Sequence, residues 1–233
     1  MIAFFLMLCE GVGTFLILNG KLYAHDPRNF QLAIATAEGQ RWLLAARVLR
    51  FIGRLSFPLF AYFVAEGFRR TSSVGKYIFR MGFFAALSEI PFDLAYYGEI
   101  YHPEAQNVLL TYFIALIALY FIRLAQKMPW LQVIIAIPFC YIAWLVKCDY
   151  GAMGVAMICI LYILRHERKA QLIVGAALSV AESLEYYGVS ALSFLLLGTY
   201  NGNRGDTPMK YFFYLMYPLH MAAFYALTYF VNR

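Results

Sequence analysis

Charged residues are scarce in this chain, and their scarcity excludes most classes of soluble protein. Only 14% of the 233 residues are charged, whereas 63% are hydrophobic. A typical soluble domain has about 25% charged and about 45 to 50% apolar residues. The composition therefore predicts an integral membrane protein. The net charge of +6 reflects basic loops, and we expect no nucleic-acid partner.

Metal ligands and redox motifs are also few. The four cysteines have no CxxC or metal-type spacing, which argues against a disulfide framework. No two of the four histidines share a helix face, and no P-loop or dinucleotide fingerprint is present. We therefore expect no metal site. The cysteines are interpreted as packing residues: Cys9, Cys140, Cys148 and Cys159.

Long apolar runs, by contrast, recur every 20 to 30 residues. Runs of this length are typical of spanning helices and not of a β-barrel. The predicted fold is all-α, a polytopic membrane helical bundle forming one domain over residues 1–233. About nine spans are predicted, near residues 2–18, 43–67, 77–97, 107–125, 129–147, 151–164, 171–187, 188–200 and 211–231. The seventh and eighth are short, which suggests broken or re-entrant helices, and residues 19–41 are predicted to be a long loop.

Basic residues alternate between the connections, which predicts the orientation. Arg69, Arg123, Arg168 and Arg204 follow the even-numbered spans, whereas the connection around Glu104 is acidic. The positive-inside rule therefore predicts a cytoplasmic N-terminus and an external C-terminus. The basic residues within 19–41 do not fit this pattern, because the connection after the first span would lie outside. The first span lacks a basic leader and carries a central glutamate, so we expect it to be retained.

Three arginines form the sharpest feature inside an apolar segment. Arg47, Arg50 and Arg54 stand at i, i+3 and i+7, so a helix places them on one face. Each would cost about 2.5 to 3.5 kcal/mol at the centre of a bilayer. Arg47 and Arg50 are compatible with snorkelling to the headgroups, whereas the deeper Arg54 favours a function.

Carboxylates also occur within the apolar segments. Glu89 and Asp93 stand at i and i+4 around Pro91, which frees a backbone carbonyl and bends the helix. The pair either faces a polar cavity or supplies counter-ions to the arginine face. Glu182 and Glu185 share a face of the seventh span, but the adjacent Tyr-Tyr-Gly indicates an interfacial position.

His220 is the one histidine within a predicted span. It follows Pro218 and lies close to Tyr217. A buried imidazole must be hydrogen-bonded, and its pKa near 6.5 suits a general base. A structural hydrogen bond between helices is the alternative interpretation.

Several sequence blocks together resemble the TraX family. They are GRLSFPLFAYFVAEGFRRT (53–71), ALSEIPFDLAYYG (86–98), QNVLLTYFIAL (106–116), DYGAMGV (149–155), YNGNRG (200–205) and FFYLMYPLH (212–220). The resemblance implies a multi-pass protein of the bacterial inner membrane that transfers an acyl group. The family's founding function is N-terminal acetylation of conjugative pilin, and the family is distantly similar to the acyltransferase-3 group. The resemblance implies acetyl-coenzyme A as donor and an amine or hydroxyl acceptor. The family's first span carries an Asp-His pair, where this chain has Glu10 and Gly11.

Acyl transfer needs a base, cations for the phosphates of coenzyme A, and donors for an oxyanion. We expect His220 to be the base, oriented by Glu10 or Glu89. Arginine binds phosphate bidentately, so the expected substrate or cofactor ligands are Arg50, Arg54, Glu89, Asp93, Asn201 and Arg204. The acceptor remains open between a pilin-like protein, a peptide and a glycan. Two alternatives stay open, an inactive membrane assembly protein, favoured by Gly11, and a transporter, for which no inverted repeat is visible.

Overall fold

The computed structural model describes residues 1–202 and 210–231, and this part of the chain contains helices and no β-strand. The all-α prediction is therefore confirmed. The elements are α1 (Ile2–Gly11), the π-helical η1 (Val12–Lys21), α2 (Pro27–Ile34), α3 (Ala37–Gly53), α4 (Ser56–Arg70), α5 (Val74–Tyr97), α6 (Val108–Leu124), α7 (Pro129–Leu145), α8 (Gly151–Ile163), α9 (Arg168–Glu182), the 3-10 turns η2 (Leu184–Tyr186) and η3 (Val189–Leu192), α10 (Ser193–Gly198) and α11 (Lys210–Val231).

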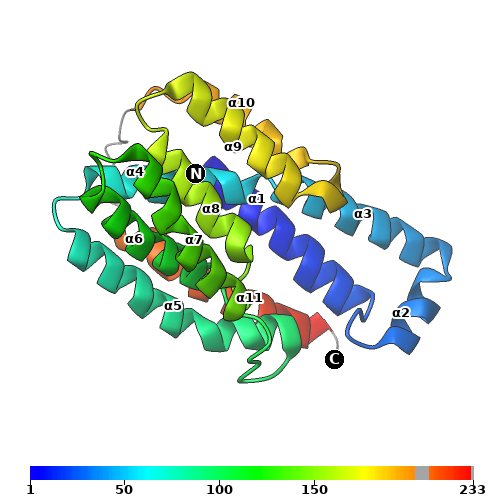
Figure 1. Ribbon diagram of the computed structural model, residues 1–233. Coiled ribbons are helices and arrows are strands. Elements are labelled where there is room, and N and C mark those ends of the chain that lie inside the picture. Colours follow the sequence, from blue (N-terminus) through cyan, green and yellow to red (C-terminus); the bar gives the residue numbers. More distant parts are fainter. Residues whose placement is uncertain (203–209, 232–233) are drawn as a thin grey trace.

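The core of the bundle is the packing of α4, α6 and α8. In Figure 1, α6, α7 and α8 lie side by side in alternating directions, with α5 along α6. Leu116 and Leu119 of α6 and Met157 and Ile158 of α8 are completely buried. The apolar sequences of these helices make this burial favourable, and Asn107 caps α6 by accepting a hydrogen bond from the amide of Leu109 at 3.0 Å.

One end of the bundle collects the basic turns. Helix α6 ends and α7 begins there, as α8 ends and α9 begins. Helix α4 ends at the same place. The ring of Phe68 in its last turn packs edge-on against Tyr162 of α8, with centroids 5.3 Å apart. We call this the basic end, and it carries Arg69, Arg70, Arg123, Lys127, Arg165 and Arg168.

The start of α1 and the end of α11 lie toward opposite ends of the bundle. Phe4 of α1 packs against Phe212 near the start of α11, and Phe15 packs against Phe224 further along both elements. The first segment and α11 therefore run in the same direction, away from the basic end. Helix α2 stands apart near the opposite end (Figure 1).

Two helical stretches are long and apolar enough to cross a membrane, judged over the described residues, and the second includes a turn at Arg54 and Leu55. They are Ile2–Lys21, with a mean hydropathy of 1.9, and Ala37–Arg70, with 1.4. Four further apolar helices are shorter, Val108–Leu124, Pro129–Leu145, Gly151–Ile163 and Val189–Gly198. Together with the sequence composition, these helices indicate membrane association.

The structure corrects two predicted boundaries. The predicted second span is interrupted at Arg54 and Leu55, which separate α3 from α4. The predicted long loop contains α2, which begins at Pro27 and is capped by Asp26, whose carboxylate accepts from the amide of Arg28 at 2.9 Å. Proline in the first turn and an aspartate cap are favourable at a helix start, and the prediction gave them too little weight. The predicted break near residue 188 is present, since η2, η3 and α10 are all short.

Candidate functional site

The break between α3 and α4 is supported by two serines from a distant part of the chain. Ser190 donates a hydrogen bond to the carbonyl of Arg54 at 3.2 Å, and Ser193 donates to the carbonyl of Leu55 at 2.8 Å. A helix end leaves carbonyl groups without an intrahelical partner, and leaving them unpaired in an apolar interior is costly. The short elements η3 and α10 therefore stabilise the break and fix the position of Arg54.

Arg54 lies between two carboxylates. Its Nε is 3.5 Å from Oε1 of Glu10 on α1, and its Nη1 is 4.0 Å from Oε1 of Glu182 on α9. Its guanidinium carbon stands 4.6 Å from the ring centroid of Tyr186, and that of Arg50 stands 5.5 Å from the same centroid. Both distances are within the range of a cation–π contact. We call these five residues the arginine cluster.

Close helix packing brings Glu10 to this cluster. A β-carbon placed on Gly53 would lie 2.3 Å from Cβ and 2.8 Å from Cα of Glu10. Only glycine permits such an approach, and it lets α1 lie directly against the end of α3. The carboxylate that pairs with Arg54 is therefore supplied by the first helix, whereas the sequence had suggested Glu89.

Asp149 approaches the same region from the turn between α7 and α8. The turn is held by backbone hydrogen bonds of 3.0 and 2.8 Å with Gln106, and Tyr150 stacks on Phe57 at 3.6 Å between centroids. Lys147 and Tyr150 both have positive φ angles, 54° and 60°, which are uncommon for residues with side chains. Burial raises the pKa of Asp149 to about 7; the charge of Glu10 also raises this pKa, whereas the charge of Arg54 lowers it.

Glu89 and Asp93 form a separate group near the start of α6. Asn107 donates to the carbonyl of Ala85 at 2.9 Å and to Oε2 of Glu89, while Oδ2 of Asp93 accepts from the amide of His102 at 2.9 Å. The other oxygen of each carboxylate has no hydrogen-bond partner among the described residues. The carboxylates recorded in ion pairs with Arg54 are Glu10 and Glu182. The described contacts therefore do not support the interpretation of Glu89 and Asp93 as its counter-ions.

His220 is buried in α11, with 7% of its surface exposed. Its Nδ1 is 2.8 Å from the carbonyl oxygen of Met216, one turn earlier in the same helix. A carbonyl can only accept, so Nδ1 carries the proton and Nε2 of the neutral ring is the acceptor. The tautomer is thus set by the helix backbone and not by a carboxylate or Tyr217, although the Tyr217 ring packs edge-on 5.2 Å away.

Gly11 faces α11 close to this histidine. A β-carbon on Gly11 would lie 2.2 Å from the ring of Phe224, and the Phe224 ring packs edge-on against His220 with centroids 6.0 Å apart. The position where the family's histidine is expected is therefore filled by a phenylalanine ring. His220 lies one helical turn away from it.

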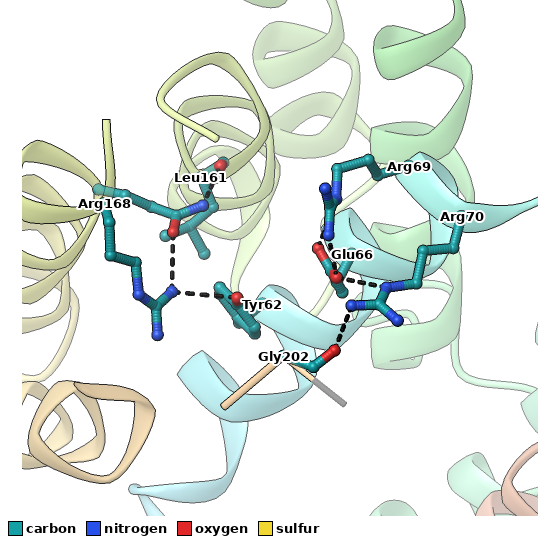
Figure 2. A network of polar contacts seen from close by, with 8 residues as sticks. Tyr62, Glu66, Arg69, Arg70, Leu161, Arg168 and Gly202 are labelled. Atoms are coloured by element: carbon teal, nitrogen blue, oxygen red, sulfur yellow. Dashed lines mark hydrogen bonds and ion pairs between the residues drawn. The ribbon is translucent and has the colours of Figure 1, made fainter. Parts of the chain in front are cut away.

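A second polar network lies at the basic end, and Figure 2 shows it. Glu66 accepts hydrogen bonds from both Arg69 and Arg70, and Arg70 also donates to the carbonyl of Gly202. Arg168 donates to the hydroxyl of Tyr62 at 3.0 Å. This network joins α4, α9 and the segment after α10.

The remaining predicted ligands also belong to the segment after α10. Asn201 is described and exposed, directly before Gly202, whereas Arg204 lies outside the described residues. Arg69 lies 15 positions after Arg54, mostly within α4, which corresponds to roughly 22 Å along a helix. The predicted site residues therefore do not form one site. They divide between the arginine cluster, the Glu89 group, His220 and the basic end.

Sequence reasoning missed three residues of the arginine cluster and its surroundings. Glu182 was assigned to the membrane interface, Tyr186 was not considered, and Asp149 was read only as part of a motif. The available signal was the burial of charge within apolar segments, which favours ion pairing. It did not indicate which distant helices meet.

Comparison with known proteins supplies the family. The family model described as TraX protein matches residues 1–228. A relative described as "Probable fimbrial assembly protein FimC, serogroup H1", from Dichelobacter nodosus, is 31% identical over 198 residues, covering 75% of this chain and 80% of the relative. No solved structure matches the chain. Since the family match covers almost the full length, the chain belongs to the TraX family.

Proposed function

We propose that this protein is a multi-pass membrane acyltransferase that acts in pilus or fimbrial assembly. The observation that carries the proposal is the arginine cluster, in which α1, α3 and α9 bring Arg54, Glu10 and Glu182 together within an apolar bundle. Charged groups in such a position are costly and mark functional sites in membrane proteins. The family and the relative's printed name favour pilus assembly as the context.

The outer faces of the helices favour repeated membrane crossing. Helix α7 exposes large apolar side chains along its whole length, with Val133 55%, Ile137 61% and Leu145 54% exposed. A soluble monomer rarely exposes a contiguous apolar surface of this kind, whereas lipid would cover it. We propose that the basic end lies in the cytoplasm of a bacterium and that the membrane is the inner one.

The basic end offers cations for an anionic donor. Arg69, Arg70 and Arg168 come together there with the segment that contains Asn201 and Gly202. Guanidinium groups bind phosphate bidentately, so we propose that acetyl-coenzyme A enters at this end. No group of metal-binding residues is present among the described residues. In the proposed reaction a side chain transfers a proton.

His220 is the proposed base. With Nδ1 donating to Met216, its Nε2 is the nitrogen that can take a proton from an acceptor amine or hydroxyl as it attacks the thioester carbonyl. The carbon–sulfur bond then breaks and the thiol of coenzyme A leaves with the proton. Arg54 would hold an anionic part of the substrates. Glu10 would position Arg54, and it would not orient His220.

An assembly protein without catalytic activity is the second candidate. The ring of Phe224 packs where the family's first-span histidine is expected, next to Gly11. The relative's printed name refers to assembly and not to transfer. This packing favours a role in which the bundle binds a partner without modifying it.

Release of coenzyme A from acetyl-coenzyme A separates these possibilities. Detergent-purified protein is incubated with acetyl-coenzyme A and a peptide with a free N-terminus, and the released thiol is measured by colour reagent. We expect thiol release together with a gain of about 42 Da per acetylated peptide, because one acetyl group replaces one hydrogen. His220→Gln should lower the rate by about 10² to 10⁴, whereas His25→Gln, in an exposed connection, should not change it. Absence of any release in folded wild-type protein would overturn the proposal and favour the second candidate.

A further inference from the structure

An open apolar groove lies between α6 and α7 at the basic end. It has a volume of about 690 Å³, and its lining is mainly apolar, including Phe121, Leu124, Leu131, Ile135 and Phe139. None of these residues belongs to the arginine cluster or to the network of Figure 2. The groove is therefore a separate feature of the bundle.

The length of the groove matches one leaflet of a membrane. It extends from the turn at Met128 to Phe139 within α7, and the helix rises by about 15 Å over the ten steps from Pro129 to Phe139. The hydrocarbon core of a bilayer is about 30 Å thick, so the groove has the depth of one acyl layer. Pro138 lines the inner part of the groove, where a proline removes one helical hydrogen bond and loosens local packing.

The rim of the groove is positively charged and carries an interfacial aromatic residue. Lys127 lines the groove, and Arg123 is exposed in the last turn of α6. The segment from 121 to 139 contains these two charges and no acidic residue. Trp130, at the start of α7, is 65% exposed, and tryptophan is enriched at the level of the headgroups.

We propose that this groove binds an anionic phospholipid, with one acyl chain against the apolar lining and the headgroup phosphate at Arg123 and Lys127. The apolar length accounts for the acyl chain. Arg123 and Lys127 have no ion pair among the described residues, and their charge accounts for the preference for a negative headgroup. The inference rests on the membrane crossing in the proposed function, but not on acyl transfer. A bound lipid would fill the groove between α6 and α7 at the basic end and thereby stabilise the hairpin that these helices form.

Native mass spectrometry of the full chain tests the proposal. The protein is released from micelles that contain equal amounts of phosphatidylglycerol and phosphatidylcholine with the same acyl chains. We expect one retained phosphatidylglycerol and little phosphatidylcholine. The double variant Arg123→Gln/Lys127→Gln should lower phosphatidylglycerol retention by about 25-fold, because each of the two cations near the surface contributes about fivefold.

Two further variants make the result specific. Lys21→Gln/Lys147→Gln removes two exposed cations away from the basic end and should leave retention unchanged. Ile135→Trp fills the groove and should displace the lipid irrespective of its headgroup. Equal retention of both lipids by the wild type, or equal losses in the two charge variants, would overturn the proposal. So would a dimer that Ile135→Trp dissociates, because the groove would then hold a second copy of the chain.

The acyl-transfer assay on the same preparations keeps the two proposals apart. Loss of lipid binding with normal thiol release would refute only the lipid site. Specific lipid retention without thiol release would leave the lipid site standing and refute acyl transfer.

Discussion

The contact between α1 and α3 gives the sharpest test of how the arginine cluster is assembled. In Gly53→Ala, the new methyl group would lie 2.3 Å from Cβ, 2.8 Å from Cα and 2.9 Å from the backbone nitrogen of Glu10. Because two of these atoms belong to the backbone, rotation of the Glu10 side chain cannot remove the clash. Helix α1 must move away from α3, and the 3.5 Å contact between Glu10 and Arg54 must lengthen.

The expected loss follows from two opposing effects. Overpacking of a well-packed interior costs about 1 to 3 kcal/mol, and the backbone contact favours the upper part of this range. Replacing glycine by alanine inside a helix contributes about 1 kcal/mol in the other direction. The net change in the free energy of unfolding should be a loss of about 1 to 2 kcal/mol.

Gly75→Ala is the matched control. Gly75 also lies in a helix, but no atom stands within 4 Å of its added β-carbon, so only the gain in helix propensity remains. The free energy of unfolding is measured by titration with sodium dodecyl sulfate in mixed micelles, followed by circular dichroism. If Gly53→Ala is stabilised as much as Gly75→Ala, α1 does not pack on α3 as described. The explanation of how Glu10 comes within reach of Arg54 is then wrong.

Four further outcomes are expected. Arg54→Lys should lower the free energy of unfolding by about 1 to 2 kcal/mol, because lysine lacks the planar fork that spans two carboxylates; unchanged unfolding in the same titration would mean that Arg54 only snorkels. Asp149 has a pKa of about 7 against an ordinary value of 3.8, so the folded state holds a proton that the unfolded chain releases. Its contribution to stability is complete below about pH 4 and is lost as the pH rises through 7, and Asp149→Asn should flatten this part of the stability–pH curve. His220→Gln should remain folded by circular dichroism while transfer is lost, and activity within a few-fold of the wild type would leave His220 with only its structural hydrogen bond. Single cysteines at Ser72 and Lys127, in a background without native cysteines, should not react with an impermeant reagent outside intact cells, and labelling there would reverse the proposed orientation.

Local sequence patterns predicted most of the helices correctly. Apolar runs located α5 to α8 and α11 within about three residues and α9 within about five, because helix formation in apolar segments depends on neighbouring residues. The basic turns were also recognised from the sequence, and the bundle places those within the described residues at one end. The orientation of that end relative to a membrane stays a prediction.

The sequence also favoured a compensated charge at Arg54, because burial of a guanidinium is costly wherever the helix packs. Which groups compensate it was decided by tertiary structure alone. Glu10 reaches Arg54 because Gly53 allows α1 to touch α3, and Glu182 reaches it because Ser190 holds η3 against the break after α3. These contacts join segments far apart in the chain, and no local pattern specifies how distant helices pack. The residue types thus fixed the need for a polar cluster, and the packing of the bundle determined its members.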